Sequence, residues 1–234
     1  FVKYLILLFL HKIFTMYTLA EENYLKAILT ISLQADGKVS TNAIAQEIGT
    51  SAASVSDMLK KLQEKKLIKY EKYKGVSLSK KGKEKAINIL RKHRLWETFL
   101  VNKLGFSWDE VHYIAEQLEH IKAEKLIDKL DAFLEYPKFD PHGEPIPTKE
   151  GKIAAPNTTA LSELAVGTRG KIMGVILDDS SFLQYLNQLH IQIGTEIEIL
   201  DKIDFDKSLA IKVQHKNQHI SNDVAKHLLI KKQL

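Results

Sequence analysis

All five prolines of this 234-residue chain lie in one segment, EYPKFDPHGEPIPTKEGKIAAPNTT, which runs from Glu135 to Thr159. Gly143 and Gly151 accompany them. Proline lacks a backbone N–H and fixes φ, so this segment cannot form a continuous helix or strand. Upstream of it apolar residues recur at helical spacing, whereas downstream apolar and polar residues alternate. The sequence therefore predicts a helical first part, an ordered connector that ends in a linker, and a β-rich last part.

Two short helical patterns in the first part are separated by a glycine. Ser40 or Thr41 can cap the first helix, and Gly49 ends it because glycine adopts a positive φ without strain. Thr50 or Ser51 can cap the second helix, which continues for about four turns. Two short helices joined by such a turn form a helix-turn-helix unit.

Further patterns on both sides complete a winged helix. Apolar residues recur at helical spacing from Leu19 to Leu33, and Asp36-Gly37 predicts a turn. Residues 67–70 and 76–78 alternate like two strands around Lys74-Gly75, which predicts a β-hairpin, or wing. The packed inner face of the two short helices is expected to consist of Ala43, Ile44, Ile48, Val55, Met58, Leu59 and Leu62.

The charge of the chain favours an anionic partner. The net charge is +5, and the stretch from Lys60 to Lys85 holds eleven lysines against three glutamates. A basic block beside a helix-turn-helix is typical of phosphate binding, although a lysine-rich solvated surface gives the same pattern. The candidate DNA contacts lie on the second short helix and the wing: Ser51, Ser54, Ser56, Asp57, Lys60, Lys61, Lys72 and Lys74.

Metal-ligand residues gather on two later helical patterns, from Gly82 to Leu104 and from Trp108 to about Leu134. Offsets of three and four place side chains on one helix face. Imidazole and carboxylate groups at this spacing suit Mn(II), Fe(II) or Zn(II). The alternative is a solvated helix face. The candidates are His93 and Glu97 in RKHRLWE, with His112, Glu116, Glu119 and His120 in EVHYIAEQLEH.

The last part alternates in β fashion over residues 170–177, 195–200 and 209–213, with a helix over 181–189. Short strands separated by turns predict a small barrel of the SH3-like type. The whole fold is then mainly α with a small β part.

The first fifteen residues are apolar, but their uncharged run from Tyr4 to Leu10 is only seven residues long. A membrane-spanning helix needs about 20 residues, and a signal peptide needs a small-residue cleavage site that is missing here. We expect residues 1–15 to be an extension outside the fold; the alternative is a membrane-associating amphiphile. The absence of cysteine excludes disulfides and thiolate metal sites and fits a reducing cytoplasm.

Three motifs in order resemble one family, the diphtheria toxin repressor family of metal-dependent transcriptional repressors. RKHRLWE is similar to its Arg-x-His-Arg-x-x-Glu segment, EVHYIAEQLEH to its helix ending in Glu-His, and DPHGEPIP to its Pro-His/Phe-Gly-x-Pro-Ile-Pro connector. The resemblance implies a winged helix-turn-helix domain, a helical dimerisation and metal domain, and an SH3-like (FeoA-like) β-barrel. With the composition, it divides the chain into residues 16–86, 87–151, a linker at 152–159, and 160–234.

The resemblance also implies a ligand set. Glu119 and His120 match the family's ligand pair, and Glu116 stands where iron regulators have cysteine and manganese regulators glutamate. A carboxylate is a harder ligand and favours Mn(II) or Fe(II). Three positions depart from the pattern: Asn23, where other members have Met or Asp, Lys26 and Ser181. His142 is expected to be structural. The other positions that match ligands are Asn23 on the first helix, His93, Glu97 and His112 at a second site, and Asp178 in the β part.

The resemblance implies a repressor that is not an enzyme, with Mn(II) or Fe(II) as co-repressor and Zn(II) or another divalent ion able to bind in vitro. Its partners would be double-stranded operator DNA and a second copy of the chain, with no membrane or small-molecule substrate, in the cytoplasm. A metal held by Asn23 and by Glu116, Glu119 and His120 would fix one domain against the other. Two alternatives stand beside this reading: a metal-independent winged-helix regulator, and a metallohydrolase, for which no nucleophile motif is present.

Overall fold

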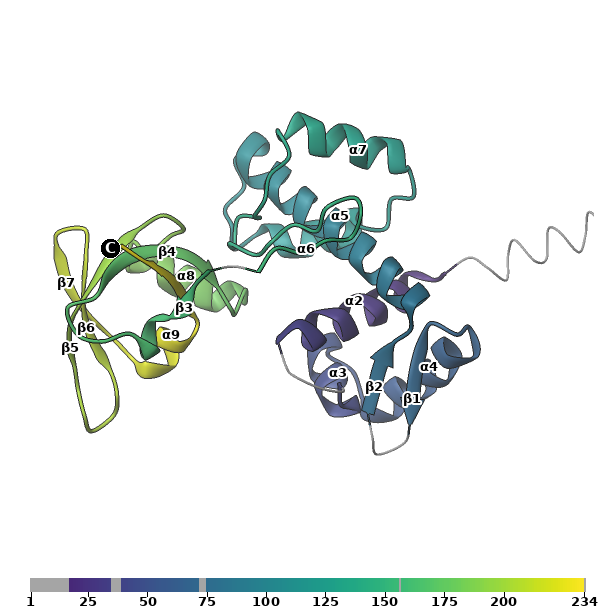
Figure 1. Cartoon of the computed structure of the whole chain (residues 1–234), viewed down its shortest axis with the longest axis horizontal. Coiled ribbons are helices and arrows are strands. Elements are labelled where there is room, and N and C mark those ends of the chain that lie inside the picture. Colours follow the sequence, from purple (N-terminus) through teal and green to yellow (C-terminus); the bar gives the residue numbers. More distant parts are fainter. Residues whose placement is uncertain (1–16, 35–38, 72–74, 156, 234) are drawn as a thin grey trace, which may run out of the picture. The chain divides into compact units, whose positions relative to one another are not determined.

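The structure is a computed structural model that describes residues 17–34, 39–71, 75–155 and 157–233 (Figure 1). It divides between Leu90 and Arg91 into two compact units. Several sequence predictions lie outside the described residues: the extension at 1–15, the Asp36-Gly37 turn, and the candidate DNA contacts Lys72 and Lys74. None of the helices in the described ranges combines the length and apolarity needed to cross a membrane.

The first unit contains the predicted winged helix. Its elements are α2 (Leu19–Gln34), α3 (Thr41–Ile48), α4 (Ala52–Glu64), β1 (Ile68–Glu71) and β2 (Gly75–Leu78). Ser40 and Ser51 cap α3 and α4 by accepting the backbone N–H groups of Ala43 and Ser54, and Gly49 ends α3 with φ of 70°. The strands pair antiparallel, with Ile68 opposite Leu78. These local predictions are confirmed.

The core of this unit is built from the predicted inner face together with α2. Ile44, Val55, Leu59 and Leu62 are fully buried. They share the interior with buried α2 and wing residues, namely Leu25, Ile28, Leu29, Leu67 and Val76. Ala43, Ile48 and Met58 are half-buried, at the edge of this core.

Helix α5 (Lys80–Leu104) contains the boundary between the units, and α6 (Val111–Leu118) and α7 (Glu124–Phe133) follow it. The prediction of one helical stretch from Trp108 to Leu134 is therefore wrong. The N–H of Glu119 still bonds to the carbonyl of Ala115, but the next turn tightens, with Ile121 N–H bonded to Leu118 O at 3.1 Å. The apolar periodicity runs across this turn, so the pattern hides the break.

The proline-rich connector packs against the first long strand of the β part. The N–H of Val175 donates to the carbonyl of His142 at 2.9 Å. Gly143 has φ of +83°, and a Cβ added there would lie 1.9 Å from the carbonyl oxygen of Met173. Only glycine allows this approach. The prediction that the connector lacks continuous secondary structure is confirmed, with one isolated bridge between Phe139 and Pro145.

The β part is one antiparallel sheet with strand order β3-β8-β4-β5-β6-β7. Its core includes Leu161, Ile172, Leu183, Ile211 and Ile230. The pairings between the described strands leave β3 and β7 at opposite edges, so the predicted barrel is not closed by its backbone ladder. The elements are β3 (Thr159–Ala160), the 3-10 helix η1 (Leu161–Glu163), β4 (Arg169–Val175), α8 (Ser180–Gln188), β5 (Glu196–Lys202), β6 (Leu209–Val213), β7 (Lys216–Ile220), α9 (Asn222–Lys226) and β8 (Leu228–Lys232).

Candidate metal centre

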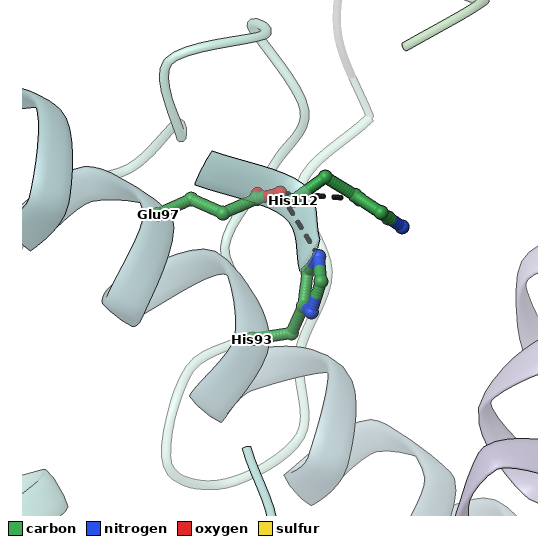
Figure 2. Close-up of side chains that lie close together, drawn as sticks. All are labelled: His93, Glu97 and His112. Carbon is green, nitrogen blue, oxygen red and sulfur yellow. Dashed lines mark ion pairs between the residues drawn. The ribbon is translucent and has the colours of Figure 1, made fainter. Parts of the chain in front are cut away.

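The carboxylate of Glu97 is buried in the second unit and lies beside two imidazoles. Glu97 follows His93 by one turn of α5, and its Oε1 lies 2.9 Å from Nε2 of His93. His112 on α6 approaches the same oxygen, with Nδ1 at 3.4 Å (Figure 2). One ligand atom from each of the three residues lies within 4.8 Å of the others. His93 and Glu97 are buried, whereas His112 is half-exposed.

The other predicted ligands of this unit extend the same network. Oε2 of the fully buried Glu119 lies 2.6 Å from Nδ1 of His93. His120 Nε2 lies 3.9 Å from Oε1 of Glu119. His112 also faces Glu116 at 3.7 Å and Asp178, which follows β4, at 3.4 Å. The structure thus brings together every predicted ligand of the second unit.

Two details of the predicted ligand set differ in the structure. His112, Glu116, Glu119 and His120 do not share one helix, because α6 ends at Leu118. Glu119 keeps a helical position as the C-cap, whereas His120 lies in the following turn. Asn23 lies on α2 in the first unit, where its side-chain oxygen is buried and has no hydrogen-bond partner among the described residues.

The connector supplies a second group of ligand atoms that sequence reasoning missed. Glu97, Asp140 and His142 are all buried, and one ligand atom from each lies within 4.8 Å of the others. Oε2 of Glu97 lies 3.7 Å from Nδ1 of His142, so Glu97 belongs to both groups. The available signal is the Asp-Pro-His spacing inside a segment stiffened by prolines, whereas the sequence predicts only a structural role for His142.

Arg94 fixes the connector beside this group. Its guanidinium donates to the carbonyl of Pro145 and to Oε2 of Glu144, each at 2.6 Å. Its Nε lies 3.4 Å from Oδ2 of Asp140. Asp140 Oδ1 in turn accepts the backbone N–H groups of His142 and Glu144. The motifs RKHRLWE and DPHGEPIP are therefore joined physically, although more than 40 residues separate them.

The electrostatics of the network reflect charges buried together. Burial would raise the pKa of the Glu97 carboxyl, but the charge of His93 and the imidazoles of His112 and His142 hold that pKa well below its ordinary value. Burial and the charges of Glu97 and Glu144 raise the pKa of Asp140 to about 7. Burial opposes charging of His142, yet Glu97 and Asp140 raise its pKa to about 10. Positive charge from the imidazoles and from Arg94 therefore balances the carboxylates buried in this small space.

Orphaned polar atoms show that the site fits a divalent metal. Glu97 Oε1, His112 Nδ1 and Asp140 Oδ2 are buried and have ion-pair contacts, but none of them makes a well-oriented hydrogen bond with a described residue. Buried polar atoms normally have hydrogen-bond partners. Carboxylate oxygens and imidazole nitrogens that face one another without such partners therefore indicate a binding site for a cation. Oxygen and imidazole nitrogen without sulfur is the donor set expected for Mn(II), Fe(II) or Zn(II).

The candidate DNA-contact residues of the first unit lie on α4. Ser51, Ser54, Asp57, Lys60 and Lys61 are exposed. The serine hydroxyls already have local partners: Ser51 and Ser54 lie 2.9 Å apart. Ser56 is half-exposed and donates to the carbonyl of Ala52. Lys60 forms an ion pair with Asp57 at 3.0 Å, and this hydrogen bond raises the pKa of Lys60.

A winged helix, a buried cluster of His and Glu side chains and a small sheet domain thus follow one another along the chain. Three family descriptions match the chain in that order. They are "Iron dependent repressor, N-terminal DNA binding domain" at residues 16–76, "Iron dependent repressor, metal binding and dimerisation domain" at 79–148, and "FeoA domain" at 159–232.

Comparisons with individual proteins also identify iron- and manganese-dependent repressors as relatives of this chain. The solved structure of a manganese-dependent transcriptional repressor in complex with manganese is 32% identical, with a TM-score of 0.84; the match covers 91% of this chain and 100% of that one. The iron-dependent repressor IdeR of Mycobacterium leprae is 33% identical over 140 residues, 59% of this chain and 60% of that protein. The chain belongs to the diphtheria toxin repressor family of metal-dependent transcriptional repressors.

The match to some relatives is partial. A probable metal transport system membrane protein of Chlamydia trachomatis is 42% identical over 76 residues, which are 32% of this chain and 17% of that protein. The chain thus spans less than two thirds of the length of these two curated relatives, 17% of this one and 60% of IdeR.

Proposed function

We propose that this protein is a DNA-binding transcriptional repressor that uses Mn(II) or Fe(II) as co-repressor. The observation that carries the proposal is the buried Glu97 carboxylate, which faces His93 and His112 on one side and Asp140 and His142 on the other. The similar solved structure is a manganese-dependent repressor, and IdeR is described as iron-dependent.

The proposed ligands are those of the connected network, with Asp140 and His142 added from the connector. Bound there, a divalent ion would take the place of the imidazole protons beside the buried carboxylates. Asn23 stays a predicted ligand, supported by its buried, unsatisfied amide oxygen. The ligands of the network are His93, Glu97, His112, Glu116, Glu119, His120 and Asp178.

The DNA-binding element in this proposal is α4 with its wing. Its exposed lysines would contact phosphate, and Ser51, Ser54 and Asp57 at its amino-terminal half would approach base edges. The proposed partners are operator DNA and a second copy of the chain. We retain the proposed division into residues 16–86, 87–151, 152–159 and 160–234, with no catalytic role for any of them.

The test is a selection from a random-sequence duplex library in Mn(II), followed by titration of the enriched duplex in Mn(II) and in chelator. We expect tight binding only with metal, and a steep loss of affinity with added salt because lysine–phosphate contacts release counterions. Equal affinity in metal and chelator would instead establish a metal-independent regulator. If the selection enriched no duplex, the proposal that this protein binds DNA would be wrong.

A further inference from the structure

The two ring nitrogens of His142 face different partners. Nε2 lies 2.8 Å from the backbone carbonyl oxygen of Trp108, and Nδ1 lies 3.7 Å from Oε2 of Glu97. A carbonyl oxygen only accepts hydrogen bonds, so Nε2 must carry a proton. When the ring is neutral, the lone pair is therefore on Nδ1, the nitrogen that faces Glu97 and Asp140. The position of Trp108 thus selects the nitrogen that can bind a metal.

Trp108 is itself held by the sheet domain. Its ring is buried in the same hydrophobic cluster as Leu161, Leu183 and Leu186. Its indole N–H donates to Oδ1 of Asn187 on α8 at 2.9 Å. The Asn187 amide then donates to Asp109, next to Trp108, at 3.3 Å. Asn187 therefore forms hydrogen bonds with both Trp108 and Asp109, at the start of the segment that leads into α6.

The same contacts fix the His142 ring and its backbone. The Trp108 and His142 rings are stacked, with centroids 6.0 Å apart and planes 20° from parallel. The His142 carbonyl accepts the N–H of Val175 from β4, and its N–H donates to Asp140. Rotation of this imidazole would break the hydrogen bond to Trp108 and disturb the stack. His142 is thus oriented by residues that the sheet domain holds in place.

We propose that Trp108 and Asn187 are positioning residues that orient His142 to bind a divalent cation through Nδ1, so that cation binding depends on docking of α8. The proposal rests on the metal centre described above. Coupling of this kind is reciprocal: a cation held by His142 must also stabilise the docked sheet domain.

The first experiment is a Zn(II) titration of Asn187→Ala, with Asn217→Ala on the edge strand β7 as the matched control. Residues that orient a metal ligand typically contribute 10–100-fold in metal affinity, so we expect a loss of about that size in Asn187→Ala and none in the control. A merely structural role would lower the melting temperature and leave the Zn(II) affinity of the folded protein unchanged. That result would overturn the proposal.

Trp108→Phe gives a second variant, because it keeps an aromatic side chain and the backbone carbonyl while it removes the indole N–H that bonds to Asn187, together with part of the buried ring. We expect its Zn(II) affinity to fall in the same direction. In a Trp96→Phe background Trp108 is the sole tryptophan. Its emission should then change on Zn(II) binding, and the change should shrink in Asn187→Ala. If the emission of Trp108 did not change on Zn(II) binding, the proposed coupling between Trp108 and the cation site would be wrong.

The nitrogen assignment has its own test. Two-bond 15N–1H correlation spectra of the Zn(II)-loaded protein should show His142 protonated at Nε2; protonation at Nδ1 would refute the assignment.

The underlying metal centre is tested separately by Glu97→Gln. If wild type and Glu97→Gln bind Zn(II) with equal affinity, the proposal that Glu97 belongs to a metal centre is wrong. If Glu97→Gln loses Zn(II) while both positioning variants keep wild-type affinity, only the positioning proposal fails.

Discussion

Gly143 connects the ligand-bearing connector to the sheet domain, and its replacement by alanine gives the sharpest stability prediction. Its φ of +83° is a left-handed conformation that costs an L-residue about 1–2 kcal/mol. The added Cβ would also lie 1.9 Å from Met173 O and 2.4 Å from Gly174 Cα, both backbone atoms of β4. The connector would have to move away from β4, which breaks the bond from Val175 N–H to His142 O.

Loss of that hydrogen bond adds about 1 kcal/mol, and loss of packing adds more, so we expect Gly143→Ala to cost ~3 kcal/mol or more. For a chain of this size, 1 kcal/mol lowers the melting temperature by roughly 2–4 °C, which predicts a fall of about 6–12 °C. The assay is thermal unfolding of the metal-free protein by circular dichroism, with chelator present throughout.

Gly167→Ala is the matched control. Gly167 has φ of +81°, but a Cβ there meets no atom of the described residues within 4 Å. Gly167→Ala should therefore lower the free energy of unfolding only by the cost of the left-handed backbone conformation, about 1–2 kcal/mol. The difference between the two variants isolates the contact of the connector with β4. Equal losses in both would refute the reasoning that the connector is packed there.

Other variants test separate parts of the structure. Arg94→Met removes the cation that is buried against Asp140 and should cost about 3–5 kcal/mol in urea unfolding; a loss below 1 kcal/mol would mean that Arg94 is not the partner of Asp140 in solution. Ser40→Ala removes the N-cap of α3 and should cost about 1 kcal/mol by the same measurement, whereas an unchanged midpoint would contradict the cap. Asp57→Asn removes a negative charge from the exposed face of α4 and should strengthen binding to random-sequence duplex in anisotropy titrations; unchanged affinity for that duplex would contradict the proposal that this face of α4 approaches DNA.

The sequence predicted best what local chemistry determines. The caps at Ser40 and Ser51, the positive φ of Gly49 and the antiparallel wing all depend on residues within a few positions of each other. The alternating strands β4, β5 and β6 followed from their period. Strand β7, KNQHI, escaped prediction because four of its five residues are polar, and only Ile220 is buried.

The candidate site was predicted in part, for a physical reason. His93 with Glu97, and His112 with Glu116, are set by helical spacing and could be identified from the sequence. Asp140 and His142 reach Glu97 only because Arg94, Trp108 and β4 fix the connector, and such long-range packing leaves no local periodic signal. The break of α6 at Leu118 was also hidden, since the tight turn keeps Glu119 in its helical position.

The most direct test of the account is the binding of Mn(II) to wild type and to Glu97→Gln, measured by the electron paramagnetic resonance signal of free Mn(II). Glu163→Gln, which alters an exposed carboxylate of η1, is the control. We expect wild type and Glu163→Gln to bind Mn(II) alike, and Glu97→Gln to lose more than about 100-fold in affinity, beyond the loss typical of residues that only orient a ligand. Unchanged Mn(II) binding in Glu97→Gln would contradict the central claim that this buried carboxylate holds the metal.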